Sequence, residues 1–553
     1  MTLYEYILQN KNKSPNTDAI RYFNYTESHK QMLDSVDFVA SSLRKYGIKK
    51  GDKVAICLPN QPEMLHIFYA INKIGAVAVM INPKSPSPEL YRQIHMTGCV
   101  MVFFSQISIR NVTGMQNMPG AKTIRYICVP ILRSLPFAID TIVRFKMLKA
   151  SDNRKYREAY GINAIQYKNF LVGKDYYDGY ETDDKADAVV IFSGGTGGAI
   201  KAVVHSSYAF NYSAESCLET ERPWPDEVAM LAILPSFHIF GLTVALHLPY
   251  IACGCAVLVP FFNLKIITDV IKKGCPSFFP GVPTMFERLL EYPGFVKAAQ
   301  RGKLDFSRFR HGFVGGDFLD NDVRDRFNAL LKKLGSSGYI SMGYGMSECC
   351  PICVNNRESG YDRSVGIPFN GMRIRIRSEE TGEYLPEGKM GEIVISSPYM
   401  MLRGIDENGN EYMPFQDDNG VKWYRTGDMG MMKEGIIYYE CRARRIIKVS
   451  GNTIFASSIE KVLQDNIPYA EAVYVVPVPH ESRGQGAYAF VVCDSRSRDM
   501  HIYSLVKNIC RENLIPYAIP VGASVITKDE VPHTAIGKVA WGQLEKMAIE
   551  RYR

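Results

Sequence analysis

Strand and helix signals alternate along the first 120 residues, and this rhythm limits the chain to a small set of folds. Apolar residues recur at helical spacing from Met32 to Leu43 and stop before Gly47, a residue that suits a helix C-terminus. The elements predicted next are a strand over 54–58, a helix over 63–73, a strand over 76–81, a helix with Ser87 as its N-cap and a strand over 100–104. Because helices connect the strands in this order, we predict an α/β fold of layered subdomains with a parallel sheet.

A second pattern begins at Arg373, where short strands stand between glycines and charged turns. Strands predicted over 373–377, 391–396 and 436–440 indicate a β subdomain over about 370–441. The signals beyond residue 443 are those of a compact α+β domain, with helices over 458–464 and 502–513 and strands over 472–476 and 488–492. We therefore expect a large N-terminal domain over 1–441 and a small C-terminal domain over 442–553.

One long apolar run raises the question of a membrane span. No Asp, Glu, Lys or Arg occurs between Val228 and Leu264, which exceeds the roughly 20 residues that a spanning helix needs. Pro235, Pro249 and Pro260 interrupt the run, however, and 256–259 has the character of a short buried strand. We interpret the run as the interior of a parallel-sheet domain, with a spanning segment as the alternative.

Charge and cysteine usage bear on partners and location. The chain has 65 Lys and Arg against 57 Asp and Glu, a net charge of +8 that is mild for 553 residues. We therefore expect no nucleic-acid partner. The N-terminus lacks a secretory pattern, and Cys350 and Cys353 have no second ligand pair at zinc-site spacing. These features predict a cytoplasmic protein with reduced thiols.

The segment 122–149 combines a long apolar series with six basic residues. Such a segment can rest on an anionic bilayer surface, which would make the protein membrane-associated. The commoner arrangement is an apolar element packed on its own domain, and we favour it here.

The most specific local signal is an apolar strand followed by a glycine-rich loop. The strand over 188–192 leads into Ser193, four glycines and Thr196, and Lys201 follows. Glycines let main-chain N–H groups converge on an anion, while hydroxyls and a lysine add donors and charge. The segment is not a Walker A loop, because Ile200 precedes the lysine and Ala202 follows it. It predicts a polyphosphate site, whereas an isolated loop of this kind is more often a tight turn.

Further markers follow the loop in a fixed order. They are Val314-Gly-Gly-Asp317, Tyr344-Gly-Met-Ser-Glu348, Tyr424-Arg-Thr-Gly-Asp428, Arg442, Val449-Ser-Gly451 and Pro532-His-Thr-Ala-Ile-Gly-Lys538. Together with the loop, this series resembles the adenylate-forming superfamily, in its branch of acyl-CoA synthetases. The resemblance implies a mobile C-terminal domain and an enzyme that uses ATP, Mg²⁺ and CoA to convert a carboxylic acid first into an acyl adenylate and then into a thioester.

The resemblance also implies a role for each marker of the first part of the chain. The residues that it places against the β and γ phosphates are Ser193, Gly194, Gly195, Thr196 and Lys201. Ser347 would contact the α-phosphate and Glu348 would hold Mg²⁺. Tyr344 would stack on the adenine, with the main chain of Gly315 and Gly316 on the other face of the base.

The later markers would bind the ribose of ATP and take part in the two half-reactions. By the same resemblance, Asp428 would accept both ribose hydroxyls with help from Arg442. Lys538 would contact the substrate carboxylate and a phosphate oxygen together as charge concentrates in the transition state. Gly451 would lie beside the pantetheine arm of CoA. Outside such a series, Lys538 would be a solvated lysine, Glu348 a surface carboxylate and Asp428 a turn residue.

Several positions depart from the family pattern. Gly197 stands where Thr or Ser is usual, Ile200 replaces Pro, and Cys441 replaces the Gly before Arg442. Arg444 occupies the position of the hinge Asp or Lys, and Arg445 makes this junction unusually cationic. A member of the family that binds nucleotide or membrane without catalysis is therefore an alternative. An esterase is disfavoured because the chain has no GxSxG elbow.

The segment Pro235-Ser-Phe-His238-Ile-Phe-Gly241 resembles the family segment that borders the acyl pocket. It lacks the Asp that would pair with an amino acid's ammonium group, so we expect an amine-free acid. The apolar residues around it favour a hydrophobic acid, fatty or aryl. His238 would gate the pocket, with a hydrogen-bonded core histidine as the alternative. CoA is the expected acceptor, and a separate carrier protein is the alternative.

Overall fold

A computed structural model describes the chain and divides it into two compact units. The first unit holds Met1–Ser193, Ile200–Arg373 and Ser396–Lys422, and the second holds Gly194–Ala199, Ile374–Ile395 and Trp423–Arg553. The residues described are 1–131, 163–172, 177–194, 200–220, 224–225, 227–349, 352–355, 364–417, 419–442, 445–449, 452–481, 483–494, 499–533 and 539–552. The expected boundary between 441 and 442 remains a prediction.

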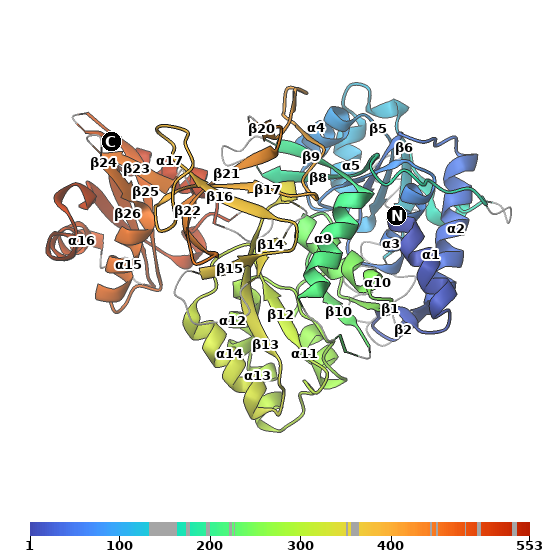
Figure 1. Cartoon of the computed structure of the whole chain (residues 1–553), viewed down its shortest axis with the longest axis horizontal. Helices are drawn as coiled ribbons and strands as arrows, with labels where there is room; N and C mark the ends of the chain where they lie inside the picture. Colours follow the sequence, from blue (N-terminus) through green and yellow to red (C-terminus); the bar gives the residue numbers. More distant parts are fainter. Residues whose placement is uncertain are drawn as a thin grey trace. The chain divides into compact units, whose positions relative to one another are not determined.

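The largest sheet of the first unit has the parallel core that the alternation predicts. Its strand order is β19 (Glu411–Tyr412), β18 (Arg403–Ile405), β9 (Ile200–Ser206), β8 (Asp187–Gly194), β4 (Val77–Met80), β3 (Lys53–Cys57), β5 (Cys99–Ser105), β6 (Arg125–Val129) and β7 (Ile165–Gln166). From β8 to β7 neighbouring strands run parallel, whereas β18 is antiparallel to both β9 and β19. The antiparallel strands β18 and β19 form a short hairpin at the edge of the sheet, beside the strand β9 that is labelled in Figure 1.

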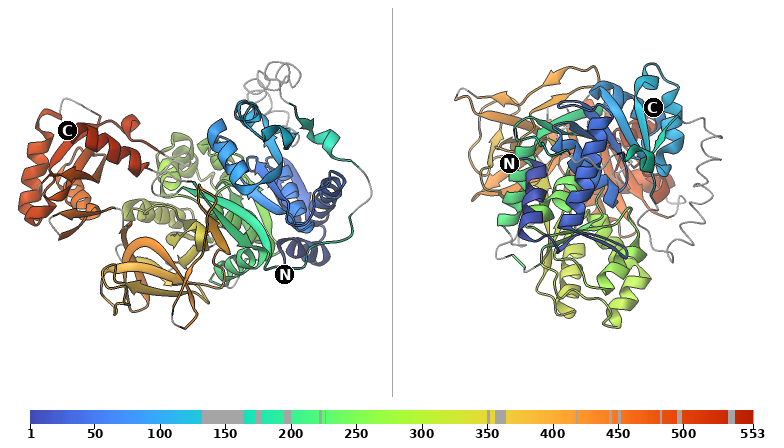
Figure 2. Two further views of the ribbon diagram at one scale, coloured as in Figure 1. Left: turned by 90° about the horizontal axis from the view of Figure 1, so that it is seen from above. Right: turned by 90° about the vertical axis from the view of Figure 1, so that its right-hand side faces the viewer.

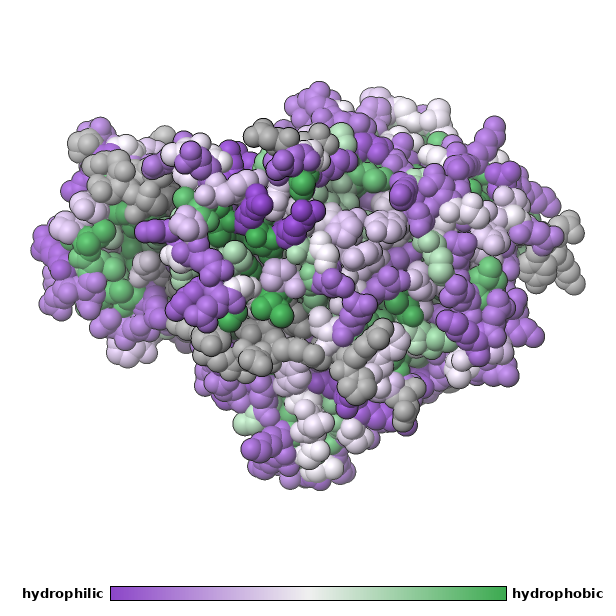
Figure 3. Space-filling model, in the orientation of Figure 1, coloured by the Kyte–Doolittle hydropathy of each residue, from purple (hydrophilic) through white to green (hydrophobic). Residues whose placement is uncertain are grey.

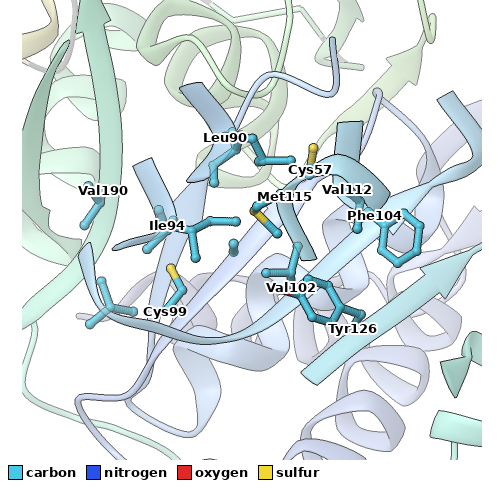
Figure 4. Packing of buried hydrophobic residues seen from close by; sticks show 14 of the residues in the cluster. Cys57, Leu90, Ile94, Cys99, Val102, Phe104, Val112, Met115, Tyr126 and Val190 are labelled. Carbon is cyan, nitrogen blue, oxygen red and sulfur yellow. The ribbon is translucent and has the colours of Figure 1, made fainter. Parts of the chain in front are cut away.

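Helices cover both faces of this sheet (Figure 2). The helices of this region are α1 (Leu3–Lys13), α2 (His29–Lys45), α3 (Pro62–Lys73), α4 (Ser87–Thr97), α5 (Ile109–Gln116), α8 (Tyr167–Phe170) and α9 (Ser207–Glu219). One core packs side chains of α4 and α5, among them Ile94 and Met115, against Val102 and Val190 of the sheet (Figure 4). Apolar burial of this kind stabilises a layered fold at roughly 25 cal/mol per Å².

A second sheet confirms that the apolar run of residues 228–264 forms the interior of a parallel-sheet domain. Its order is β10 (Ala229–Ala232), β11 (Cys255–Leu258), β1 (Asp18–Tyr22) and β2 (Tyr25–Ser28). β10 and β11 lie inside the run and pair in parallel. Between them lie a π-helix over Gly241–His247 (η3) and α10 (Leu248–Ile251). Among the described residues, no helix combines the length and apolar character needed to cross a bilayer.

The first unit is completed by a group of strands with helices beside them. The strands, in order, are β12 (His311–Val314), β13 (Tyr339–Gly345), β14 (Ile352–Asn355) and β15 (Ser364–Pro368), and β20 spans Phe415–Gln416. The helices are α11 (Leu264–Lys272), α12 (Pro283–Glu291), α13 (Pro293–Gln300) and α14 (Asn321–Lys333). β12 and β13 are parallel, so their carboxyl ends lie at the same edge.

The second unit begins with the predicted β subdomain. Its strands lie in the order β22 (Ile436–Arg442), β21 (Lys422–Lys433), β17 (Gly391–Ser396) and β16 (Arg373–Arg377). β21 is antiparallel to both of its neighbours. The long β21 therefore carries the Tyr424–Asp428 marker across the middle of this sheet.

The C-terminal part of the second unit is α+β, as predicted. The strand order is β24 (Asn452–Phe455), β23 (Ile446–Val449), β26 (Gly484–Val492) and β25 (Ala472–His480), with β27 (Gly522–Ile526) parallel to β26. The helices α15 (Ala456–Asn466) and α16 (Asp499–Asn513) bury one core with this sheet, and α17 (Trp541–Tyr552) buries another. The sequence analysis had not placed α17 or β27.

One predicted helix start is wrong. Ser87 is the first residue of α4 rather than its N-cap, because Pro86 holds the extended N-cap position and Pro88 falls within the first turn. Gly47 and Gly75, which follow predicted helices, have φ of 82° and 71°, as glycines at helix ends should.

The basic amphipathic segment is described only over 122–131. There, η2 (Ala121–Thr123) leads into β6, whose Ile127 and Val129 are fully buried. This part packs on its own domain, whereas 132–149 lie outside the described residues. Hydrophilic residues cover most of the face drawn in Figure 3, as the ordinary composition suggests.

Candidate nucleotide site

Two of the residues expected at the phosphates lie in the neighbouring strands β8 and β9, which are labelled in Figure 1. Ser193 lies near the end of β8 and Lys201 near the start of β9, and both are half-buried. The two strands are neighbours, and a link as short as 195–199 joins only antiparallel neighbours. Ser193 and Lys201 are therefore close in sequence to the two ends of this link. Gly195 and Thr196 lie outside the described residues.

One face of β9 carries Lys201 together with a histidine that the sequence analysis did not single out. Side chains of a strand alternate, so Lys201, Val203 and His205 share a face. The fully buried His205 imidazole places its Nε2 2.8 Å from the main-chain oxygen of Ser347. Burial lowers the pKa of His205 to about 4, so the ring is neutral and its N–H donates to that oxygen.

The turn that carries Ser347 and Glu348 is held from two sides. It is a 3₁₀ turn, η4 (Ser347–Cys349), directly after β13. His205 donates to the Ser347 carbonyl, and the main-chain N–H of Met401 donates to the main-chain oxygen of Glu348 over 2.8 Å. Leu402 N–H then donates to Val204 O over 2.8 Å. The first unit thus brings the Ser347–Glu348 marker next to the strand of Lys201.

The glycine pair and the tyrosine of the series lie at the shared edge of β12 and β13. Gly315 and Gly316 follow β12, and Tyr344 is near the end of β13. Gly316 has φ of 87°, which favours glycine. A Cβ on Gly315 would lie 3.3 Å from the Phe240 ring, so the main chain passes close to that aromatic side chain. Tyr344 is 7% exposed.

His238 lies on the segment between β10 and the π-helix η3. Its Nδ1 accepts a hydrogen bond of 3.3 Å from Phe240 N–H, and the side chain is half-buried. The buried Asn60 fixes this segment, because its Nδ2 donates to the oxygens of Ala232 and Leu234. π-Helices are rare in proteins, and those that occur are often at functional sites. The π-helix η3 therefore indicates a functional region here, which the sequence pattern did not reveal.

The second unit assembles the expected ribose residues around β21 and β22. Asp428 is 1% exposed and lies opposite Arg442 in the register of the two strands, with 3.0 Å between Oδ1 and the arginine Nε. Asp428 N–H donates to Thr426 Oγ1 over 2.9 Å, and that hydroxyl donates to Ile393 O over 2.7 Å. The carboxylate is thus fixed in place by its own strand and by Arg442.

A second carboxylate stiffens the same turn. Glu392 accepts from Arg425 Nε over 2.7 Å and from Gly427 N–H over 3.2 Å. Gly427 has φ of 66°, so the turn before Asp428 uses a conformation that favours glycine. Hydrogen bonds to Glu392 and the conformation of Gly427 therefore fix the turn of the Tyr424–Asp428 marker.

The positive charge of Arg445, in the expected hinge region, is paired within the C-terminal part of the chain. Its guanidinium forms an ion pair with Glu460 of α15 and stacks 3.8 Å from the ring centroid of Trp541 in α17. Arg444, Gly451 and Lys538 lie outside the described residues, so their predicted roles remain predictions. Cys350 lies outside them as well, whereas Cys349 is fully buried and burial raises the pKa of its thiol.

The donor set of the first unit is suited to a magnesium ion that the nucleotide helps to bind. Mg²⁺ is usually held by one or two carboxylates plus substrate phosphates and water. Glu348 supplies one half-buried carboxylate, and the described residues hold no cluster of three or more His, Cys, Asp or Glu side chains arranged for a metal. A cage built from protein ligands alone is therefore not present in the described part of the chain.

Comparisons with known proteins cover nearly the whole chain. A model of the family described as AMP-binding enzyme matches residues 8–404, and one of the AMP-binding enzyme C-terminal domain matches residues 458–538. A long-chain-fatty-acid–CoA ligase of Bacillus subtilis is 26% identical over 557 residues, covering 97% of this chain and 93% of its own length. A probable 4-coumarate–CoA ligase of Dictyostelium discoideum is 29% identical over 474 residues, covering 83% and 80%.

The fold is shared with solved structures. The ATP-bound structure of MatB from Rhodopseudomonas palustris aligns with a TM-score of 0.78 and 21% identity, over 100% of both chains. At this identity the likeness concerns the fold.

Proposed function

The chain belongs to the AMP-binding enzyme family, and from that premise we propose that it activates a hydrophobic carboxylic acid, fatty or aryl, and passes the acyl group to CoA. It is an AMP-forming acyl-CoA synthetase, an ATP-dependent acid:CoA ligase. The observation that carries the assignment of residues is the anchoring of the Ser347–Glu348 turn to the strand of Lys201 through His205.

The first half-reaction joins two anions. A carboxylate oxygen attacks the α-phosphorus of ATP, the bond to the pyrophosphate oxygen breaks, and acyl-AMP forms. The protein must neutralise charge and keep the attacking and leaving oxygens in line. Lys201 and Ser193 would bind the outer phosphates, together with the glycine-rich loop between them. Ser347 would contact the α-phosphate, and Glu348 would hold Mg²⁺, which neutralises phosphate charge when bound.

The nucleoside would be bound by groups that need little rearrangement. Tyr344 would stack on the adenine and the Gly315–Gly316 main chain would line its other face. Asp428 would accept the ribose hydroxyls, because a buried carboxylate that is already oriented loses little entropy on binding. Arg442, whose Nε lies 3.0 Å from Asp428 Oδ1, would help to orient that carboxylate.

The second half-reaction exchanges AMP for a thiol. The sulfur of CoA attacks the acyl carbon of acyl-AMP, the bond to the phosphate oxygen breaks, and a thioester and AMP are released. Gly451 would lie beside the pantetheine arm, and His238 would gate the acyl pocket. The C-terminal domain would move between the two half-reactions.

The acid class is supported by the residues near His238 and by the relatives. Phe240 is buried beside the Gly315 main chain, and Phe313, two residues before Gly315, is buried as well. No Asp follows Phe237 in the segment expected to border the pocket. A ligase for long-chain fatty acids and a probable ligase for 4-coumarate are among the relatives. A largely apolar acid therefore fits better than an amino acid.

Two experiments test the proposal. Exchange of labelled pyrophosphate into ATP, measured with short, medium and long fatty acids, aryl acids and sterol acids, should identify the acid. Replacing CoA by a holo-carrier protein tests the acceptor, because thioester should form with CoA and not with the carrier. The reverse result would favour the alternative, an acyl-AMP ligase that loads a separate carrier.

Lys538→Ala separates the half-reactions. We expect this variant to lose pyrophosphate release while it still converts preformed acyl-AMP to thioester. Pyrophosphate release at the wild-type rate would mean that the role given to Lys538 is wrong.

A further inference from the structure

A tyrosine that none of the sequence markers includes lies beside the predicted phosphate residues. Tyr412 belongs to β19, the outermost strand of the hairpin next to β9. The Lys201 Nζ lies 5.4 Å from the centroid of the Tyr412 ring, within the range of a cation–π interaction. Glu348 is close enough for its charge to act on the phenol. Three polar groups of the first unit therefore gather at one place.

A glycine on the neighbouring strand makes room for this ring. Tyr412 pairs with Gly404 of β18, and Gly404 pairs with Val203 of β9. A Cβ on Gly404 would lie 2.0 Å from the Tyr412 Cζ, so only glycine lets the ring lie across β18. Facing residues of antiparallel strands share a face, which places the ring on the side of β9 that carries Lys201 and His205.

The hairpin that carries the tyrosine is fixed to the sheet by charge. Both terminal nitrogens of Arg403 bind Asp187, over 2.8 and 2.6 Å, and its Nε binds Glu411 over 2.8 Å. Bidentate pairs of this kind hold geometry well. Arg403 thus connects the start of β8 to β19, one residue before Tyr412.

The phenol hydroxyl lacks a hydrogen-bond partner among the described residues, although its oxygen is buried. A buried hydroxyl without a partner is energetically costly, so such a group in a folded protein points to a role that supplies a partner. Burial, together with the charges of Glu348 and Asp406, raises the pKa of Tyr412 to about 12. The group is therefore a neutral hydrogen-bond donor throughout the physiological range, and it stands beside a cation.

We propose that Tyr412 is a binding residue for the outer phosphates of ATP, whose ring positions the Lys201 ammonium and whose hydroxyl donates to a phosphate oxygen. This inference rests on the proposed function only in that ATP is the ligand. A charged acceptor forms a stronger hydrogen bond than a neutral one, and a phosphate oxygen would therefore satisfy the buried hydroxyl when nucleotide is bound. The contact involves the phosphates that leave as pyrophosphate, so AMP does not use it.

The test compares ligands as well as variants. Binding of MgATP, magnesium pyrophosphate and AMP is measured by calorimetry on the full chain, without acid or CoA. Tyr412→Phe keeps the ring and removes the hydroxyl, so ATP and pyrophosphate should bind about tenfold more weakly and AMP should be unchanged. Tyr412→Leu also removes the ring beneath Lys201, and it should weaken ATP further.

The matched control is Tyr22→Phe. Tyr22 of β1 also has a buried hydroxyl without a partner among the described residues, and it lies in the four-stranded sheet of β10, β11, β1 and β2. This variant should leave all three affinities unchanged. ATP and pyrophosphate affinities within twofold of wild type in Tyr412→Phe would overturn the inference, and so would an equal loss for AMP. If wild type binds ATP but shows no acid-dependent exchange, the proposed function fails and the role of Tyr412 stands.

Discussion

His205 and Ser347 are joined by a hydrogen bond of 2.8 Å between a buried imidazole Nε2 and a main-chain oxygen. The bond links β9, which also carries Lys201, to the turn that carries Glu348. Two markers separated by more than a hundred residues of sequence are thereby held in register. A neutral histidine suits this position, because a charged ring would be costly to bury.

Removing this bond should impair activation more than folding. His205→Leu leaves the Ser347 oxygen without its donor, and we expect kcat/KM for ATP in pyrophosphate exchange to fall at least about tenfold. His205→Gln places an amide N–H where Nε2 stands and should retain most of the activity. Equal activity in His205→Leu and wild type, at equal thermal stability, would contradict the positioning role.

His247 should make stability depend on pH. This fully buried ring of η3 accepts from the Tyr69 hydroxyl at Nδ1 and lies 2.7 Å from the Asn211 Oδ1 at Nε2, and burial lowers its pKa to about 3. Between the unfolded pKa near 6.5 and the folded value, the unfolded chain binds the proton and the folded chain does not, so the free energy of unfolding falls as the pH falls. From pH 7 to pH 5 the loss should be about 2 kcal/mol.

The variant His247→Gln isolates the contribution of His247 to the pH dependence of the free energy of unfolding. Glutamine offers a hydrogen-bond donor and an acceptor but does not titrate between pH 7 and pH 5. Denaturant unfolding at pH 7 and pH 5 should show a pH-dependent loss smaller by about 2 kcal/mol in the variant than in wild type. The same loss in both proteins would show that His247 is not buried in its neutral form.

Gly241 is expected to tolerate no side chain. A Cβ at this position would lie 2.1 Å from the Pro235 oxygen, at the turn that carries His238. Gly241→Ala should therefore destabilise the protein by about 1–3 kcal/mol through overpacking. Gly542→Ala in α17 is the control, because nothing lies within 4 Å of a Cβ there, and it should be neutral or slightly stabilising. Similar melting temperatures for both variants would contradict the packing at Gly241.

Asp428→Asn tests the ribose site. The buried carboxylate faces Arg442, and an amide has one acceptor oxygen where the carboxylate has two. We expect ATP and AMP to bind about tenfold or more weakly, with pyrophosphate unaffected. For AMP and pyrophosphate this pattern is the reverse of that of Tyr412→Phe, whereas ATP should bind more weakly in both variants. Unchanged AMP affinity would mean that Asp428 stabilises only the turn of β21.

The sequence predicted those parts of the fold that depend on local periodicity. The helices and strands predicted between residues 32 and 104 are present, because apolar spacing reports which face of each element is buried, whereas α1, β1 and β2 were not predicted. Ser87 was placed one position wrongly, because serine is a preferred N-cap residue but the helix here begins one residue earlier, after the extended Pro86. The π-helix η3 was missed because its apolar residues are buried all round and carry no period.

The candidate site divides in a similar way. Marker residues with unusual chemistry, such as Glu348 and Asp428, could be found from their motifs. His205 and Tyr412 could not, because a histidine in an apolar strand and a tyrosine in a two-residue strand carry no local signal. Their roles follow from long-range pairing, in which Tyr412 meets Gly404 and His205 meets Ser347.

Acid-dependent exchange of labelled pyrophosphate into ATP by the wild-type chain tests the formation of acyl-AMP most directly. Label should enter ATP only when a suitable hydrophobic acid is present with Mg²⁺, and adding CoA should then yield the thioester of that acid with release of AMP. No exchange with any acid of the panel, by a protein that is folded and binds ATP, would contradict the formation of acyl-AMP.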